Sequence, residues 1–207
     1  MVRASGPASF FMLIEPVTLE GRFVSLRPLS RDHLVALCDV GLEPELWLWT
    51  VSTIINVGAM EKYLGSALED ASRGIALPFA TIDKASGKVI GSTRFGNIDS
   101  SDRKAEIGWT WVAPKSQRTY VNTEAKLLML THAFETWKCI RVELKTDALN
   151  EKSRNAILRI GAKQEGILRN HMITDSGRFR DSVYFSIIGD EWPEVKTRLI
   201  NKLNNHK

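Results

Sequence analysis

One segment near the middle of the chain limits the fold more than any other: a helix that is apolar on nearly every side, with a strand before it and a strand after it. Residues 121–137 carry two adjacent apolar stripes at helical spacing, made of Leu127, Leu130, Phe134 and Trp137 and of Val121, Ala125, Leu128 and Met129. Alternating apolar residues predict strands at 103–112 and 140–146. Strand–helix–strand units are almost always parallel, right-handed crossovers, so the sequence predicts an α/β fold around a buried helix.

The remaining segments predict one mixed sheet around this unit. Further strands are expected at 22–29, 75–83, 88–98, 162–168 and 179–188, and further helices at 30–40, 57–72, 150–160 and 192–203. The chain has 207 residues, of which 43% are apolar and 25% are charged. These values are typical of one globular α/β domain. We expect this domain to span residues 16–207, after a flexible tail of residues 1–15.

Composition excludes several kinds of protein and site. Cys38 and Cys139 lie far apart without the spacing of a metal site, so they predict buried free thiols and no bound metal. No segment approaches the roughly 18 apolar residues of a membrane span, so we expect a soluble, cytoplasmic protein without a membrane partner. The net charge of +4 suits an anionic ligand but does not by itself indicate nucleic acid, and no nucleic-acid partner is expected.

The predicted strand at 103–112 carries one ionisable group on an otherwise small-residue face. Alternation places Ala105, Ile107, Trp109 and Trp111 on one face and Glu106, Gly108 and Thr110 on the other. Glu106 is therefore a candidate for acid–base chemistry. A strand carboxylate paired with a lysine, or simply solvated, is the alternative.

The polar loop between this strand and the buried helix is the most informative segment. A helix start offers free backbone N–H groups and the positive end of the helix dipole, which together favour a phosphate group. Lys115 and Arg118 add positive charge, and further donors come from Ser116, Gln117, Thr119 and Thr123. An ordinary helix start capped by Asn122 or Thr123 is the alternative.

A second polar helix start follows the next strand, at residues 146–153. Parallel strands bring their carboxyl ends to the same edge of a sheet, where ligands of α/β proteins bind. Asn150 and Ser153 share one side of the first helical turn there. Simple capping by Asn150, with no ligand, is again the alternative.

Taken together, these motifs resemble the GCN5-related N-acetyltransferases (GNAT), specifically the branch of the RimJ and RimL ribosomal-protein acetyltransferases. The resemblance covers about residues 20–190. It rests on Glu106-Ile107-Gly108-Trp109, on residues 117–125, on Asn150-Glu151-Lys152-Ser153 with Gly161-Ala162 behind it, and on Glu165-Gly166 followed by Arg180-Asp181-Ser182-Val183-Tyr184. The order of these motifs is much more specific than any one of them.

The resemblance implies a fold and a coenzyme site. The fold would be the GNAT fold, a mostly antiparallel sheet with a central parallel pair of strands that splay apart. The pyrophosphate of acetyl-CoA would lie on the loop formed by Gln117, Arg118, Thr119, Tyr120, Val121, Asn122 and Thr123. Its pantetheine arm would lie like an extra strand along Trp111 and Val112. Asn150 would contact the pantetheine, and Ser153 would lie near the sulfur.

The sequence departs from the family pattern at two places. The family usually has glycine at the position of Tyr120 and glycine or alanine at the position of Asn122, because larger side chains there crowd the phosphates. Tyr120 must therefore point away or stack on the coenzyme. Ile157 occupies the place of a tyrosine general acid found in many members, so that role would pass to Ser153 or Tyr184, or be absent.

The chemistry implied is direct transfer of an acetyl group to an amine. An alkylamine is mostly protonated at neutral pH, so a base helps, and Glu106 is the candidate, acting through water. A backbone N–H near Val112 would stabilise the developing oxyanion. Ser153 or Tyr184 would supply a hydrogen bond or proton to the leaving thiolate.

The acceptor is not fixed by the sequence. It would be a protein or peptide N-terminal α-amine, a small-molecule amine or an aminoacyl conjugate, and residues 47–73 would help to decide it. A catalytically degenerate module that binds CoA or a partner is the second hypothesis, motivated by Tyr120 and Ile157. The expected partners are acetyl-CoA and the acceptor, and a homodimer is compatible with the sequence.

Overall fold

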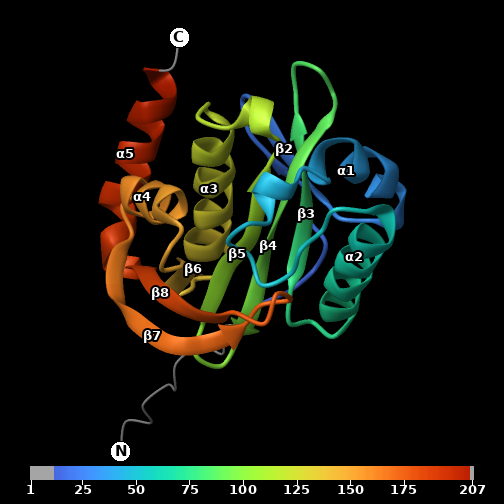
Figure 1. Ribbon diagram of the computed structural model, residues 1–207. Helices are drawn as coiled ribbons and strands as arrows, with labels where there is room; N and C mark the ends of the chain where they lie inside the picture. The colour runs from blue at the N-terminus through green and yellow to red at the C-terminus, as the bar shows by residue number, and fades with distance from the viewer. Residues whose placement is uncertain (1–11, 206–207) are drawn as a thin grey trace, which may run out of the picture.

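The computed structural model describes residues 12–205, and its centre is an eight-stranded sheet in the order β1-β2-β3-β4-β5-β6-β8-β7 (Figure 1). The strands are β1 (Leu19–Glu20), β2 (Val24–Pro28), β3 (Leu77–Asp83), β4 (Val89–Asp99), β5 (Lys104–Val112), β6 (Arg141–Asp147), β7 (Lys163–Ile173) and β8 (Phe179–Ile188). The helices are α1 (Leu34–Gly41), α2 (Val57–Ser72), α3 (Val121–Thr131), α4 (Glu151–Arg159) and α5 (Trp192–Asn204). Neighbouring strands are antiparallel except β5 and β6, so the predicted mixed sheet with one parallel pair is confirmed.

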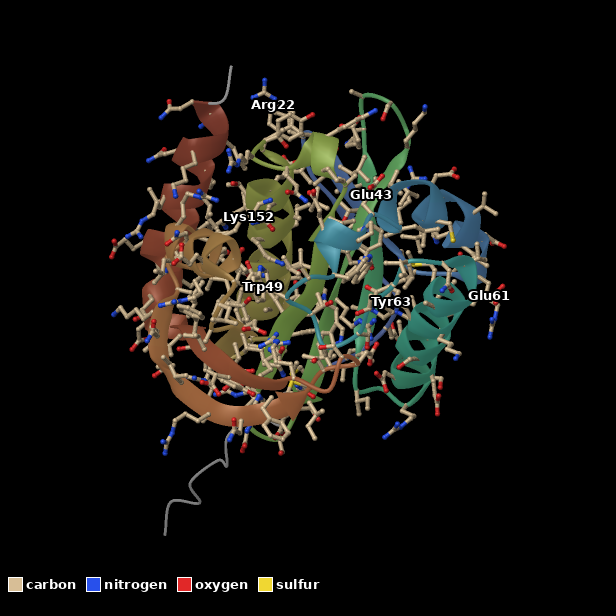
Figure 2. The ribbon with its side chains drawn as sticks, viewed as in Figure 1. Arg22, Glu43, Trp49, Glu61, Tyr63 and Lys152 are labelled. Atoms are coloured by element: carbon tan, nitrogen blue, oxygen red, sulfur yellow. The ribbon has the colours of Figure 1, made fainter. Side chains whose placement is uncertain are left out.

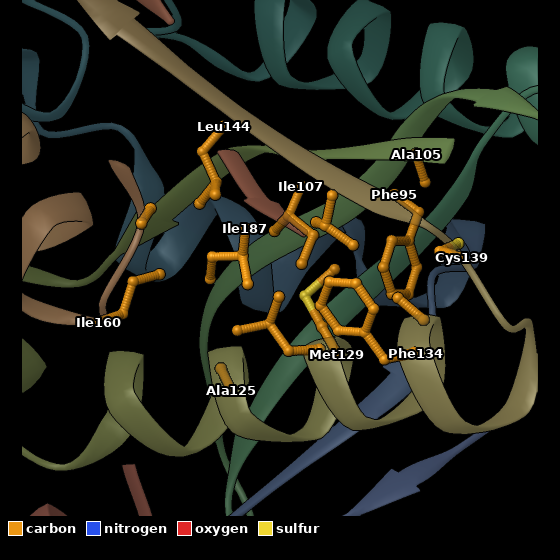
Figure 3. Packing of buried hydrophobic residues seen from close by; sticks show 14 of the residues in the cluster. Phe95, Ala105, Ile107, Ala125, Met129, Phe134, Cys139, Leu144, Ile160 and Ile187 are labelled. Atoms are coloured by element: carbon orange, nitrogen blue, oxygen red, sulfur yellow. The ribbon is translucent and has the colours of Figure 1, made fainter. Parts of the chain in front are cut away.

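Helices cover both faces of the sheet (Figure 1). We call the side with α3, α4 and α5 the α3 face, and the side with α1 and α2 the α1–α2 face. Figure 3 shows Met129 of α3 packed with Phe95 and Ile107 of the sheet, within the larger of two apolar cores. The smaller core lies under α1 and α2 and includes Leu37 and Met60. Because α3 contacts the sheet on one side and α5 on another, its nearly all-round apolar surface is buried as predicted.

Two elements differ in length from the sequence prediction. The α-helical part of α3 ends at Thr131, and the chain continues as a wider π-helical turn over His132–Thr136. β7 extends to Ile173, beyond the predicted end at 168, because it pairs with β8 again after an irregularity between Leu168 and Met172. Both differences depend on tertiary pairing and packing, which the local pattern does not contain.

Most of the expected tail of residues 1–15 lies outside the described residues. Of those that are described, Met12 is buried in the larger core. The carbonyl of Leu13 accepts a hydrogen bond from the Trp137 indole at 2.9 Å. The first described residues therefore pack against the domain.

β5 and β6 pair over a short distance and then diverge. Their parallel register joins Lys104, Ala105 and Glu106 to Arg141, Val142 and Glu143. Beyond these residues β5 stays paired with β4, and β6 stays paired with β8, but the two no longer pair with each other. Facing edges with unpaired N–H and C=O groups accept an extended ligand as an added strand. The splayed parallel pair implied by the resemblance is thus present.

The buried carboxylate of Glu124 fixes the start of α3 to the N-terminal strands. Its side chain accepts hydrogen bonds from the backbone N–H groups of Arg22 at 2.8 Å, Phe23 at 2.7 Å and Val24 at 2.6 Å. A Cβ atom at Gly21 would lie only 2.6 Å from this carboxylate, so only glycine permits the approach. The turn between β1 and β2 is therefore held on the first turn of α3.

We predict that Glu124→Gln lowers the free energy of unfolding by about 2–3 kcal/mol, because charge-assisted hydrogen bonds to buried amides weaken and an amide N–H would face other N–H donors. Urea denaturation of the purified variant measures this change. Glu151→Gln is the matched control, because Glu151 lies in the first turn of α4 but is exposed and accepts no hydrogen bond among the described residues. Equal midpoints and slopes for both variants would contradict the assignment.

Candidate active site

A β-bulge in β5 lies where β5 and β6 diverge. The register between β4 and β5 skips a residue, so that Thr93 of β4 opposes both Trp109 and Thr110. Trp109 has a φ of 49°, in the left-handed region that is rare for a bulky residue and typical of such irregularities. The bulge reverses the alternation of side chains, so Ile107 packs in the core of the α3 face but Trp111 packs in the core of the α1–α2 face. The expectation that these two residues share one face is therefore wrong.

The end of β5 offers its backbone, not its side chains, to a ligand. The Trp111 ring is buried, with its centroid 5.5 Å from that of Trp47. The carbonyl of Val112 accepts a hydrogen bond from Gln117 Nε2 at 2.8 Å, and Gln117 Oε1 accepts one from Lys152 Nζ. Gln117 thereby links the end of β5 to the first turn of α4 across the splayed strands.

The loop before α3 keeps free donors at its helix start. The alternative of a helix start capped by Asn122 or Thr123 is wrong, because α3 begins at Val121 and both residues lie inside its first turn. Their backbone N–H groups donate to no acceptor among residues 12–205. Arg118, with a left-handed φ of 62°, is exposed just before them and pairs with no carboxylate in the described chain. These groups fit the needs of a pyrophosphate.

Tyr120 points away from the phosphate loop. Its ring stacks on Phe23, with centroids 4.4 Å apart, and its hydroxyl donates to Asp83 Oδ1 at 3.3 Å. Burial, followed by the negative charge of Asp83, raises the pKa of this phenol. A side chain where the family has glycine therefore does not crowd the helix start, and of the two alternatives for Tyr120 the structure contains the first.

The start of α4 is capped in the way the alternative hypothesis expected. Asn150 Oδ1 accepts a hydrogen bond from the Ser153 backbone N–H at 2.9 Å. The Ser153 hydroxyl makes no hydrogen bond among the described residues and is half-buried. Ile157 packs in the larger core, so it has only a structural place here. Because Asn150 caps the helix with Oδ1, its side-chain N–H groups remain available for a ligand.

Sequence reasoning missed Lys126, which lies one and a half turns into α3. Its side chain is 5% exposed, and its ammonium donates to the hydroxyls of Thr110 at 2.7 Å and Thr93 at 3.4 Å, directly behind the bulge. No carboxylate pairs with it in the part of the chain that the structure describes. Burial lowers the pKa of Lys126 to about 7. A polar residue inside an otherwise apolar helical stripe is the one signal that could have marked it.

Glu106 lies on the α1–α2 face, almost fully buried, as one member of an ion pair. Its Oε2 accepts hydrogen bonds from Lys145 Nζ and Asn97 Nδ2, both at 2.8 Å. Its Oε1 has no donor among the described residues. The alternative hypothesis of a lysine-paired carboxylate therefore describes the structure, while one carboxylate oxygen is left for a water molecule or an amine.

Tyr184 lies beside this ion pair, on β8. In the register of β6 and β8 it faces Lys145, whose Nζ lies 5.7 Å from the centre of the phenol ring. On its other side the ring meets His171 edge to face, with centroids 5.6 Å apart. The two candidates for the leaving-group proton thus come from different elements, Tyr184 from β8 and Ser153 from the first turn of α4.

The aromatic linker between α1 and α2 crosses the α1–α2 face and reaches the β7–β8 turn. The Asp175 N–H donates to Val51 O, and the Thr53 N–H donates to Asp175 Oδ2, both at 2.9 Å. The Arg178 guanidinium lies 5.7 Å from the centre of the Trp49 ring. In Figure 2, Trp49 lies between Lys152 on the α4 side and Tyr63 on the α2 side. The linker is therefore held against the β7–β8 turn.

Other kinds of site are absent from the described residues. They contain no cluster of histidine, cysteine and acidic side chains that could hold a metal ion. No helix within residues 12–205 has the length and hydropathy needed to cross a membrane. Both cysteines are free thiols; Cys139 is buried, as predicted, but Cys38 is half-buried. Burial raises the pKa of Cys139 to about 11, so this thiol is not a reactive group.

The family comparison decides the classification. The model of the acetyltransferase (GNAT) domain family matches residues 24–163, which include the splayed strands, the loop before α3 and the start of α4. The chain belongs to the GNAT family of N-acetyltransferases. The family uses acyl-CoA as the acyl donor, which agrees with the free amides and the opened sheet of this member.

Individual relatives agree with this classification. The chain is 36% identical over 110 residues to YdaF of Bacillus subtilis, named as a ribosomal N-acetyltransferase, and the match spans 53% of this chain and 59% of that protein. A structure described as an acetyltransferase from T. thermophilus is 32% identical, with a TM-score of 0.84 over 93% of this chain and 100% of that one. Mycobacterium smegmatis RimJ in complex with CoA-disulfide is 26% identical, with a TM-score of 0.75 over 86% of this chain and 88% of that one.

We predict that the buried amine of Lys126 makes stability rise with pH. Between a folded pKa of about 7 and an ordinary value of 10.5, the unfolded chain binds a proton that the folded chain does not, so raising the pH favours folding. Lys126→Met should therefore raise the free energy of unfolding, relative to the unmodified protein, most at pH 6. At pH 9 this difference between variant and unmodified protein should be smaller by about 2–3 kcal/mol. The Thr93 and Thr110 hydroxyls stay paired with each other at 2.7 Å in this variant.

Urea denaturation at the two pH values measures the effect. Lys62→Met, at an exposed position of α2, controls for the loss of a lysine, and it should not reproduce the trend because a solvated ammonium loses little hydration on folding. An advantage of Lys126→Met that stays constant from pH 6 to pH 9 would show that Lys126 is charged in the folded protein throughout this range.

Proposed function

We propose that the protein transfers an acetyl group from acetyl-CoA directly to a primary amine. The acceptor would be a protein or peptide N-terminal α-amine or a small-molecule amine. Glu106 would be the general base. The observation that carries the proposal is the opening between β5 and β6, because it joins free amides at the start of α3 on one side to a buried carboxylate on the other.

The coenzyme side would bind the donor through backbone groups and charge. In this proposal the pyrophosphate lies against the amides of Asn122 and Thr123 and the side chains of Lys115 and Arg118. The pantetheine arm takes up the edge of β5 near Trp111 and Val112, which does not pair with β6, as an added strand would. The remaining loop residues, Gln117, Thr119, Tyr120 and Val121, shape this loop, and acetyl-CoA supplies the activated acetyl group.

Glu106 would take the proton from the acceptor. The attacking amine must be neutral, and a carboxylate reaches it directly or through one water molecule. Lys145 and Asn97 hold Oε2, which orients the carboxylate and directs Oε1 to the acceptor. The ion pair with Lys145 also places a positive charge 2.8 Å from this carboxylate.

Other groups would assist bond breaking. A backbone N–H near Val112 would stabilise the charge that develops on the acetyl oxygen. Ser153, on the coenzyme side, is suited to donate a hydrogen bond to the departing sulfur, and Asn150 to hold the pantetheine. Tyr184, beside Glu106 and Lys145, would supply a proton if the sulfur comes within its reach.

The protein-acceptor branch of the proposal draws on the relatives. One of them is named as a ribosomal N-acetyltransferase and another as RimJ. The linker, which crosses the face on which Glu106 lies and carries Trp49, would contact either a peptide end or a small amine.

A catalytically degenerate CoA-binding or interaction module is the second candidate. The ion pair between Glu106 and Lys145 favours it, since one oxygen of the carboxylate is already engaged by an ammonium and by the Asn97 amide. The two candidates share the coenzyme but differ in turnover, so one set of measurements separates them.

We predict that Glu106→Gln lowers kcat by about 100-fold or more, the usual contribution of a general base. The rise in melting temperature caused by acetyl-CoA should persist, because the coenzyme side is unchanged. Thiol release with a panel of amines and N-terminal peptides measures turnover. Glu143→Gln is the matched control, because Glu143 faces Glu106 in the register of β5 and β6 but pairs with Arg141.

Three results would count against the proposal in different ways. Full activity of Glu106→Gln would show that Glu106 is not the general base. Binding of acetyl-CoA by the unmodified protein without turnover of any amine would favour the degenerate module. If acetyl-CoA does not shift the melting temperature, the protein does not bind this coenzyme.

A further inference from the structure

Arg180 is a buried arginine that makes no hydrogen bond within residues 12–205. It is 7% exposed, and its buried Nε has no hydrogen-bond partner in this range. Asp147 Oδ2 lies 3.7 Å from Nε, which makes an ion pair but is too long for a hydrogen bond. None of the five guanidinium donors finds an acceptor among the described residues. Asp147 therefore balances part of the positive charge of Arg180, but the N–H donors of the guanidinium make no hydrogen bond to the described residues.

Asp147 is already committed to other donors. It is fully buried, accepts a hydrogen bond from the Leu149 N–H at 3.0 Å, and accepts a second from Arg178 Nη2 at 2.5 Å. Arg180 is thus the second, more distant cation on this carboxylate. Burial lowers the pKa of Arg180, while the charge of Asp147 opposes this change. A guanidinium kept in such a place without hydrogen bonds is costly unless a further acceptor binds it.

The side chain of Arg180 lies on the acceptor side of the sheet. Val183 and Phe185 of β8 pack in the core of the α3 face, so the alternate residues Arg180 and Tyr184 lie on the α1–α2 face. Arg180 is also close enough to Glu106 for the charge of that carboxylate to act on it. Its unused donors therefore belong to the same face as the carboxylate proposed to receive the acceptor's proton.

The charges around Arg180 are unbalanced. Lys145 is paired with Glu106, and Arg178 is paired with Asp147, so Arg180 adds positive charge that neither carboxylate neutralises fully. Elsewhere on this face the balance is different: Arg141 donates to Glu143, Glu165 and Ser186, so its donors are occupied. The excess is local to the acceptor side of Glu106.

A second buried arginine extends this positive region. Arg94 of β4 is 3% exposed and makes no hydrogen bond among the described residues. Its guanidinium lies between the rings of Trp109 at 4.8 Å and Tyr63 at 5.1 Å, with Asp70 at 3.8 Å. The acceptor side is consequently unfavourable for a polyamine, since two or more cationic groups would approach buried arginines.

We propose that the acceptor amine carries an oxyanion group, a carboxylate or a phosphate, which binds the guanidinium of Arg180. This inference rests on the proposed acetyl transfer and specifies its acceptor class. The planar fork of arginine matches both kinds of oxyanion with two parallel hydrogen bonds. The oxyanion takes up the unused donors and the excess charge, and it holds the acceptor while its amine lies at Glu106. Arg180 is then a specificity-determining residue.

Matched acceptors test the inference. We would compare alanine with alaninamide, and phosphoethanolamine with ethanolamine. The third pair consists of the peptides Ala-Glu-Ala and Ala-Gln-Ala, both with an amidated C-terminus. The members of each pair share an amine and differ in the oxyanion, and the three pairs place it next to the amine, one residue away, or on phosphorus. We expect kcat/KM to favour the anionic member of at least one pair by about tenfold or more.

Arg180→Gln should bring that ratio close to one. The ratio is the readout, because damage to the fold or to coenzyme binding lowers both members alike. Arg141→Gln is the control and should keep the ratio, because the donors of Arg141 are occupied within the protein. Arg180→Gln leaves Asp147 paired with Arg178, and should it nevertheless fail to fold, Arg180→Lys decides, since an ammonium keeps the charge but loses the fork.

Each outcome decides the inference. A preference for an oxyanion that is lost in Arg180→Gln, or much reduced in Arg180→Lys, supports it. Ratios near one for all three pairs, or a preference unchanged in the Arg180 variants, overturn it. If no amine is acetylated, the proposed function fails separately, and melting temperatures decide the inference instead: with acetyl-CoA present, an anionic member must stabilise the unmodified protein more than its neutral partner does.

Discussion

The parallel pairing of β5 and β6 stops after three residue pairs, and both sides of the candidate site depend on that break. In a continuous sheet the N–H and C=O groups of these edges would bond to each other, and the sheet would separate α3 from the α1–α2 face. The bulge at Trp109 lies at the same place and turns the end of β5. As a result the sheet is interrupted between the helix start and Glu106, which lie on opposite faces.

α3 supports this opening with two buried charges of different kinds. The carboxylate of Glu124 receives three backbone N–H groups and thereby ties the helix start to the N-terminal strands. The amine of Lys126 donates to the hydroxyls of Thr93 and Thr110 and pairs with no carboxylate among the described residues, and burial lowers its pKa to about 7. The carboxylate thus has charge-assisted hydrogen bonds to three amides, whereas the amine has two neutral hydroxyls. Both fix elements that border the splayed strands.

The acceptor side is organised by cations and aromatic rings. Trp109 lies between Arg94 and Lys145, with the guanidinium 4.8 Å and the ammonium 5.9 Å from the ring centre. Lys145 in turn holds Glu106, while Arg180 keeps its donors unused. In the proposed function, an acceptor that brings an anion would gain an interaction that a simple amine lacks. Selectivity and proton transfer would thus use neighbouring groups of one cluster.

The sequence by itself determined the apolar helix, the strands beside it, the parallel unit and the polar helix start, because all of these follow from periodicity within a short segment. It also indicated Glu106 as the one ionisable group on its face of β5. Only the tertiary structure decided the bulge, the direction of Tyr120, the burial of Lys126 and the unused donors of Arg180. Each of these depends on a partner from another part of the chain. The bulge depends on the register with β4, and the direction of Tyr120 depends on Asp83 at the end of β3. Lys126 depends on Thr110 of β5, and the donors of Arg180 stay unused because Asp147 already pairs with Arg178. Local spacing carries no information about such contacts, since they form only when distant segments pack together.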